Sequence, residues 1–480
     1  MMRTRARDPR LLLALWVFQL VAYFIPAATW SPTSRYALTH ALVELHSAEL
    51  GRWGDATGDR ARVGEAWYSD KAPLPAIAAV APYAITRGIH WLLGSPAPDF
   101  ASRDANGVVA VRVELSATGR QTFYASSVGV SGLAATAITL LLLVFLERRF
   151  SSPASLVAVV AVVAATPVLP YATALYGHVP AGALLLGALV ALDPRGPRER
   201  LPIAGLCLAA AAGCEYLTAL PAAVIGGWAV LRTGARAAPR RLGGLALGAA
   251  LPILIVAAYH QVCFGAPWRT GYSFLANARF VEGHTHGLMG IGLPSPEALF
   301  GLLFGVRRGL LFLAPITALA LVGLGAALRE ADEAVRVGAG ALLVLFLANA
   351  GYYMWWGGAA TGPRHLVPML PVLGVGLAWL WDRHPRVRAF VVGLALLSFA
   401  NMLAFTAVGI EAPEEGNALF DYAFARLAEG QVAALGSANN LGIMLGLAPA
   451  ASLGPLLVWC LVGLRLLWVR TNAPASEEAA

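Results

Sequence analysis

Residues 123–149 read FYASSVGVSGLAATAITLLLLVFLERR, and this stretch decides the class of fold. Its apolar part is long enough to cross a hydrocarbon core of about 30 Å, and two arginines follow it. Hydrophobic residues make up 58% of the chain and charged residues 13%, with a mean hydropathy of +0.66. Because these values are far too apolar for soluble domains, we predict an all-α polytopic membrane protein.

Similar apolar stretches recur along the chain and predict about twelve membrane spans. By residue number, the predicted spans are 11–29, 123–146, 154–170, 181–193, 202–218, 219–231, 243–263, 308–328, 337–353, 366–381, 389–408 and 441–464. The segment 75–93 is also apolar enough to cross. A crossing there would move every later loop to the other side of the membrane, so we interpret it as an amphipathic helix on the outer surface.

The arginines predict the orientation. They collect before the first span and in alternate short loops, 148–149, 195–200, 232–241, 329–336 and 383–388. By the positive-inside rule, both termini are expected in the cytoplasm and the long first loop outside. The formal charge of +8 has the same origin, and it comes without RNA-binding or zinc-finger motifs, so no nucleic-acid partner is predicted. The Ala-, Gly- and Arg-rich composition is typical of a high-GC bacterium, which predicts a location in the plasma (inner) membrane.

The spans and loops divide the chain into six predicted segments. They are a cytoplasmic arm with the first span (1–29), a long outer loop (30–122), a transmembrane module (123–263), a second outer loop (264–307), the C-terminal transmembrane helices (308–470) and a cytoplasmic tail (471–480). The spans hold almost no ionisable residue near mid-membrane, where coupled transporters usually need them. Any chemistry is therefore expected on the outer face, where polar residues gather.

Lys71 in the first outer loop is the only lysine among the 35 basic residues. A chain this rich in arginine is expected to use arginine wherever charge alone is needed. A lone lysine therefore indicates a compact ammonium donor of the kind that binds a phosphate as a point charge. The alternative is a solvated loop lysine without a role.

Lys71 belongs to the segment Tyr68-Ser-Asp70-Lys71-Ala-Pro, and the same loop contains Arg35-Tyr36-Ala37. These segments resemble the Y-x-E-K-P-P and R-Y-A motifs in the first outer loop of GT-C-type glycosyltransferases, above all the aminoarabinose transferase and protein O-mannosyltransferase-like family. The resemblance implies a GT-C-type helical bundle whose first outer loop carries two surface helices. It also implies an inverting enzyme that moves a sugar from a polyprenyl-phosphate donor to a hydroxyl of a lipid, glycan or protein acceptor.

The resemblance further implies that Lys71 and Arg35 hold the lipid phosphate, whose charge must be stabilised as it leaves, and Tyr68 and Asp70 lie in the same motif. The sequence departs from the family at its acids. Pro32-Thr33 stands where the family has an acidic pair, and His178 stands where relatives have an aspartate.

The catalytic base therefore cannot be transferred from the family motif. We predict Asp59, twelve residues before Lys71, as the base, with Asp55, Glu44 and Asp70 as alternatives. A solvated Asp59 paired with Arg60 or Arg62 is the competing interpretation. His178 is either a base or phosphate contact, or a structural histidine at a helix end.

Three further arginines, Arg307, Arg308 and Arg364, are candidate phosphate contacts near the outer ends of spans. Trp355 and Trp356 are interfacial anchors or a platform for a sugar. No cofactor is predicted, although His284 and His286 could bind a divalent metal with Glu282. Two rival functions stay open: a flippase or transporter of a lipid-linked carrier, and an inactive GT-C-like scaffold.

Overall fold

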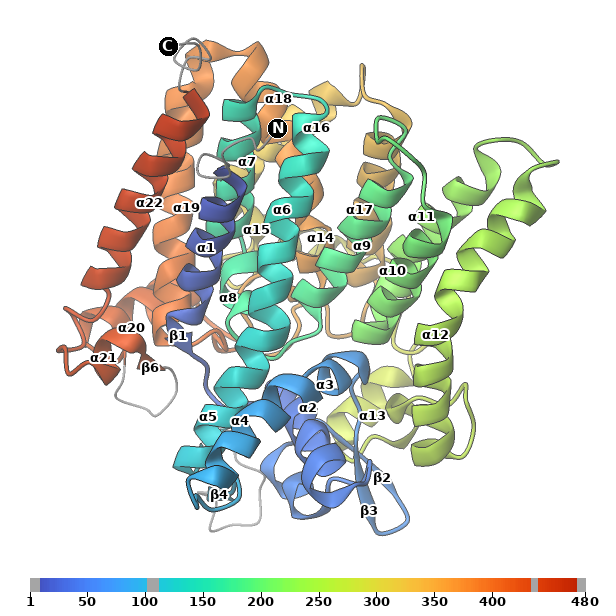
Figure 1. Cartoon of the computed structure of the whole chain (residues 1–480), viewed down its shortest axis with the longest axis vertical. Coiled ribbons are helices and arrows are strands. Elements are labelled where there is room, and N and C mark those ends of the chain that lie inside the picture. The colour runs from blue at the N-terminus through green and yellow to red at the C-terminus, as the bar shows by residue number, and fades with distance from the viewer. Residues whose placement is uncertain (1–8, 102–111, 433–438, 473–480) are drawn as a thin grey trace.

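Twelve apolar helices form a single bundle in the computed structural model, which describes residues 9–101, 112–432 and 439–472. In Figure 1 they run roughly parallel to the long axis. Six are long enough to cross a membrane and six are shorter. In chain order they are α1 (Pro9–Ala22), α5 (Ala117–Ser127) continuing through η4 (Val128–Gly132) into α6 (Leu133–Glu147), α7 (Ser152–Ala164), α9 (His178–Leu192), α10 (Leu201–Cys214), α11 (Ala219–Leu231), α12 (Ala238–Phe264), α16 (Ile316–Ala327), α17 (Glu333–Ala350), η7 (Arg364–Val372) with α18 (Leu373–Arg383), α19 (Arg388–Val408) and α22 (Gly454–Asn472). The predicted all-α membrane bundle is confirmed.

Several predicted span boundaries are wrong, and prolines or glycines account for them. The span predicted at 441–464 is instead a short α21 (Leu441–Met444) and a separate α22, because Gly446 takes a left-handed φ of +84° and Pro449 follows. The span predicted at 154–170 ends at Ala164 and restarts after Pro167 as α8 (Val168–Ala172). The span predicted at 308–328 is broken before Pro315 into α15 (Leu310–Leu313) and α16.

The first long loop folds as a compact cap at one end of the bundle. It contains α2 (Trp30–His40), η2 (Ala41–Leu45), η3 (Gly51–Ala56), the hairpin β2 (Arg60–Val63) and β3 (Ala66–Ser69), then α3 (Leu74–Ala78) and α4 (Val80–Leu92). The segment 75–93 forms α3 and α4, which pack on α2 and α5 at this end and do not cross the bundle (Figure 1). The predicted surface helix is therefore confirmed. Ile85, Trp91 and Leu92 leave apolar side chains exposed on α4, as an interfacial helix does.

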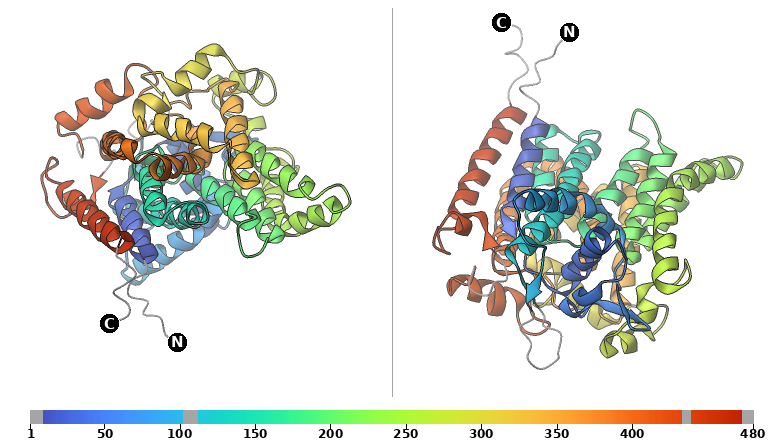
Figure 2. Two further views of the ribbon diagram at one scale, coloured as in Figure 1. Left: turned by 90° about the horizontal axis from the view of Figure 1, so that it is seen from above. Right: turned by 60° about the horizontal axis from the view of Figure 1, so that its bottom comes forward.

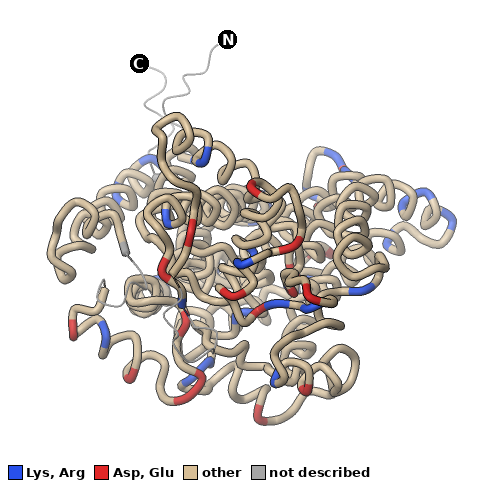
Figure 3. Tube along the Cα trace, turned by 90° about the horizontal axis from the view of Figure 1, so that it is seen from below, with Lys and Arg blue, Asp and Glu red and all other residues tan. Residues whose placement is uncertain are grey.

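The opposite end holds the start of α1, the end of α22 and the short arginine-rich loops (Figure 1). Buried Asp193 accepts hydrogen bonds there from Arg148 and Arg149, and Arg149 also pairs with Asp332. These pairs join the ends of α6 and α9 to the start of α17. Figure 3 shows the other, cap-bearing end, where acidic and basic residues are interspersed.

Small residues let neighbouring helices approach closely. A Cβ on Gly248 of α12 would lie 1.7 Å from the carbonyl oxygen of Pro202 on α10, and one on Gly205 would lie 1.9 Å from that of Leu245. Such backbone contact drives helix association in a membrane, where apolar surface has no water to escape. Both views in Figure 2 place α22 at the rim of the bundle, beside α1.

Candidate functional site

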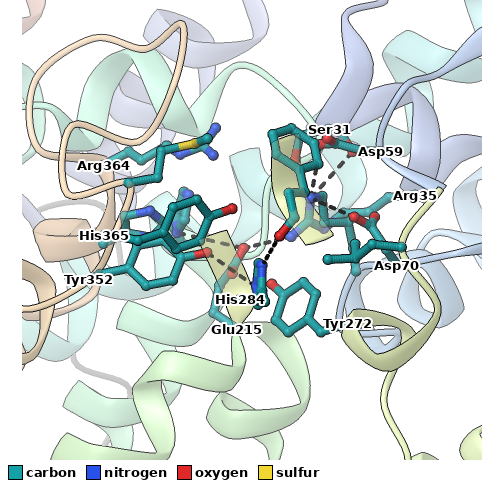
Figure 4. A pocket seen from close by; sticks show the side chains of 16 residues that line it. Ser31, Arg35, Asp59, Asp70, Glu215, Tyr272, His284, Tyr352, Arg364 and His365 are labelled. Atoms are coloured by element: carbon teal, nitrogen blue, oxygen red, sulfur yellow. Dashed lines mark hydrogen bonds and ion pairs between the residues drawn. The ribbon is translucent and has the colours of Figure 1, made fainter. Parts of the chain in front are cut away.

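A polar pocket lies between the cap and the cap-side ends of the bundle helices (Figure 4). It encloses about 530 Å³, its mouth included. Segments far apart in the chain contribute to it: α2, the hairpin, the ends of α9 and α10, the loop after α12, and η7. Its lining residues are Ser31, Arg35, Asp59, Asp70, Lys71, His178, Glu215, Tyr272, Leu275, Phe280, His284, Tyr352, Tyr353, Met354, Arg364 and His365.

The β2–β3 hairpin brings Asp59 to Lys71. Its register pairs Arg60 with Ser69, and the chain turns at Gly64, whose φ of +61° favours glycine. The residues just beyond the paired ends, Asp59 and Asp70, therefore flank the same position. The Lys71 Nζ atom lies 3.0 Å from Asp59 Oδ2 and 3.2 Å from Asp70 Oδ2.

The Lys71 ammonium thus forms ion pairs with the two buried carboxylates of Asp59 and Asp70. Burial raises the pKa of Asp70 from its usual value to about 6, although the Lys71 ammonium lies beside it. Burial alone would lower the pKa of Lys71, but Asp59 and Asp70 outweigh it and raise that pKa. Lys71 therefore stays cationic at neutral pH.

A second ion pair, between Arg35 and Glu215, lines the same pocket. Arg35 lies on α2, where its guanidinium donates to Ser31 Oγ at 2.7 Å and to Glu215 Oε1 at 2.6 Å. Glu215 follows the last residue of α10, and the same oxygen lies 3.6 Å from His178 Nδ1. Gly177 makes this approach possible, because a Cβ there would lie 2.1 Å from the carbonyl oxygen of Cys214.

Several polar atoms around the pocket have no partner in the structure. Arg364 Nε, His365 Nε2, Arg35 Nε and Asp70 Oδ1 are buried without a hydrogen bond. Figure 4 shows Arg364 and His365 on the wall that faces Asp59 and Arg35. Buried polar groups are normally satisfied, so these atoms indicate that the pocket is built to receive a polar or charged ligand.

Six of the predicted site residues come together in the pocket. Lys71, Arg35, Asp59, Asp70, His178 and Arg364 all line it. Asp59 is paired with Lys71 rather than with Arg60 or Arg62. His178 begins α9 and stacks on Tyr176 with ring centroids 5.6 Å apart. Their roles stay predictions.

Of the three alternative acids, Asp70 lines the pocket beside Lys71, whereas Asp55 and Glu44 lie outside the lining. Asp55 pairs with Arg60 at 2.7 Å, and its side chain is 67% exposed. Glu44 accepts hydrogen bonds from Arg87 at 2.9 Å and from Tyr83 at 3.1 Å. Asp55 and Glu44 thus already have partners away from Lys71, which makes Asp59 a better candidate than either.

The remaining candidates also lie away from the pocket lining. Arg308 is fully buried and donates to backbone carbonyls, among them those of Trp356, Gly358 and Pro413. Arg307 donates to the Glu414 carbonyl, and its guanidinium lies 5.2 Å from the Trp355 ring centroid. Both arginines therefore hold loops together.

Tyr68 lies on β3 with its ring 6.0 Å from that of Phe264. Its motif neighbours Asp70 and Lys71 line the pocket, whereas Tyr68 packs against the end of α12.

Sequence reasoning gave no pocket role to Glu215, Tyr272 or His284, although it considered His284 as a metal ligand. Glu215 carried a usable signal, since it is an acid near the outer end of the predicted span 202–218. Tyr272 and His284 come from the loop after α12, and their approach depends on tertiary contacts, such as the ring contact of 4.8 Å between them. The metal site that His284, His286 and Glu282 could have formed is not assembled: within residues 9–101, 112–432 and 439–472, no three His, Cys, Asp or Glu side chains are grouped to hold a metal.

A second cavity of about 800 Å³ adjoins the polar pocket. The two share Ser31, Asp59, Phe280, Met354 and Arg364 in their linings. Asp59 and Arg364 are therefore open to both cavities. This arrangement provides two adjacent chambers with a carboxylate at their junction.

The bundle and its cap give this membrane protein a GT-C-type fold. The same fold is found in ArnT, the aminoarabinose transferase, from Cupriavidus metallidurans. Its crystal structure bound to undecaprenyl phosphate matches with a TM-score of 0.54 and 16% sequence identity, covering 96% of this chain and 76% of that chain. The apo-state structure matches with a TM-score of 0.52 and the same identity and coverage. No family model and no curated protein matches the chain. At 16% identity, the likeness establishes the fold.

Proposed function

We propose that this protein is a membrane glycosyltransferase that moves a sugar from a polyprenyl-phosphate donor to an acceptor hydroxyl. The observation that carries the proposal is the ion-paired polar pocket with its unpartnered cationic atoms. The ArnT structure bound to undecaprenyl phosphate, which has the same fold, supports a lipid-phosphate ligand. The expected site of action is the outer face of the plasma membrane.

Three cations are available for the donor phosphate. Lys71 would bind it as a point charge, while Arg35 and Arg364 present guanidinium groups from opposite walls. The sugar–phosphate bond breaks with the electron pair leaving on the phosphate oxygen, so charge grows where these cations lie. When the donor binds, its phosphate would replace part of the contact that each cation now makes with a carboxylate.

Asp59 is the proposed base. Its carboxylate lines both cavities, so a donor in the polar pocket and an acceptor in the second cavity would meet beside it. The acceptor oxygen attacks the anomeric carbon, the bond to phosphate breaks, and the hydroxyl proton passes to the Asp59 carboxylate. Single displacement of this kind inverts the anomeric centre.

Matched substitutions test the site. Purified full-length protein is incubated with radiolabelled polyprenyl-phosphate sugars and membrane extract, and new labelled product is counted. Asp59→Asn should lower transfer at least ~100-fold, since general-base catalysis contributes about 10²–10⁴ in rate. Lys71→Met should also lower it at least ~100-fold, since one group that stabilises the leaving charge contributes about 10²–10³. Arg62→Met and Asp55→Asn, on the exposed face of the same loop, should leave transfer unchanged.

Other outcomes would overturn the proposal. Full activity in both pocket variants would remove the site assignment. Label that crosses a sealed bilayer without a new product would identify a flippase. If a range of donor sugars and acceptor extracts gave neither a labelled product nor label across the bilayer, an inactive scaffold would be favoured.

A further inference from the structure

An apolar groove lies away from the pocket, on the side of the bundle where α22 forms the rim. Four helices line it: α1, α7, α19 and α22. It encloses about 1060 Å³, its open side included, and its walls are almost wholly apolar. Val157 and Val160 of α7 and Ala395 and Phe399 of α19 are typical of its lining.

The packing of α22 explains why the groove stays open. α22 lies close to α1, because a Cβ on Gly463 would lie 2.3 Å from the Trp16 ring and Trp16 Nε1 donates to the Cys460 carbonyl at 3.3 Å. On the other side, Ala164 of α7 and Ala395 of α19 are too small to reach across. The space between α22 and α19 is therefore left without protein side chains.

One end of this groove is cationic and aromatic. Arg465 and Trp468 of α22 line it, and the Trp468 ring contacts that of Trp381 on α18 with centroids 6.1 Å apart. The Arg388 guanidinium lies 5.2 Å from the centre of the same Trp381 ring. No acidic residue is among the groove's lining residues, all of which lie in the described part of the chain.

The depth of Arg465 suits a lipid headgroup. It lies about two turns before the end of α22 at Asn472, roughly 10 Å along the helix axis. An exposed arginine at that depth extends its guanidinium towards the interface, where tryptophans also concentrate. Two arginines without a lining acid favour a headgroup with net negative charge over a zwitterionic one.

We propose that this groove binds one anionic phospholipid, with an acyl chain between α7, α19 and α22 and the headgroup phosphate on Arg465. The lipid would complete the packing of α22, which packs on the bundle mainly through α1 and α7. The site is separate from the polar pocket and does not depend on the proposed function.

Two matched pairs of variants test the groove. Full-length protein in detergent is titrated with dioleoylphosphatidylglycerol or dioleoylphosphatidylcholine, and native mass spectrometry counts the bound lipids. The wild type should retain one phosphatidylglycerol in preference to phosphatidylcholine. Arg465→Gln should weaken phosphatidylglycerol binding about fivefold and remove the preference, whereas Arg470→Gln on the same helix should not.

The second pair of variants tests whether a larger side chain in the groove displaces the lipid. Ala395→Leu places a larger side chain in the groove, while Ala400→Leu adds the same bulk at an exposed position of α19 that does not line it. Only Ala395→Leu should lower retention of the lipid and the thermal stabilisation that it confers. Equal effects within either pair would overturn the proposal. A change of oligomeric state in Ala395→Leu alone would also overturn it, since the occupant would then be a second copy of the chain.

Discussion

Asp70→Asn should make the protein more stable above pH 6. Asp70 is fully buried, and its pKa is raised from 3.8 to about 6 by burial. An acid whose pKa is higher in the folded chain binds more protons when folded than when unfolded, so stability falls as pH rises through that range. The stabilising contribution of protonated Asp70 is therefore fully present below about pH 4 and is lost above about pH 6.

The magnitude follows from the size of the shift. A difference of about two pKa units corresponds to roughly 3 kcal/mol of destabilisation at neutral pH. Asparagine resembles the protonated acid in shape and charge, so Asp70→Asn should recover about that amount at pH 7 and little at pH 4.

The assay is the thermal unfolding midpoint in detergent at pH 4, 5, 6 and 7. The gap between the unfolding midpoints of Asp70→Asn and wild type should widen from pH 4 to pH 6 and level off by pH 7. Asp55→Asn is the matched control, because Asp55 is exposed in the same loop and should give parallel curves. Parallel curves for Asp70→Asn as well would refute the reasoning, since they would mean that Lys71 fully compensates the Asp70 charge.

Two further substitutions probe the second ion pair and the helix packing. Glu215→Gln should lower transfer, measured at saturating donor, about tenfold or more, because Arg35 loses a charged acceptor worth about 1.5–3 kcal/mol. Unchanged transfer in this variant would show that Arg35 needs no such partner. Gly248→Val should lower the unfolding midpoint, because its Cβ would overlap the Pro202 carbonyl and the α10–α12 contact must open, at a cost of about 1–3 kcal/mol or more. Gly227→Ala on α11, where a Cβ meets nothing within 4 Å, should be neutral or slightly stabilising.

Hydrophobic length was enough to predict the bundle from the sequence. This signal acts over about twenty residues, which is the scale on which a membrane selects helices. The errors lie where a proline or glycine interrupts an apolar run, as at Pro167, Pro315 and Gly446. Hydropathy measures transfer into lipid and is insensitive to a missing backbone donor, so it extended those spans too far.

The candidate site could be predicted only where its residues are close in sequence. Asp59 and Lys71 are twelve residues apart, and a short hairpin with a two-residue turn joins them. Glu215 is 180 residues from Arg35, and only the packing of α10 against the cap brings the two side chains together. The position of Arg307 and Arg308 at a span end gave no sign of their partners, which in the folded chain are backbone carbonyls.

The position of Glu215 bears on whether the pocket can be active. An inactive scaffold was a serious alternative because Pro32-Thr33 replaces the acids expected beside Arg35. In the folded chain a carboxylate does lie beside Arg35, delivered from the end of α10 rather than from the first loop. The pocket thus contains three carboxylates, those of Asp59, Asp70 and Glu215, against three cations. A chain with no need for this chemistry would gain stability by replacing such buried pairs with apolar residues, so their retention favours a functional site.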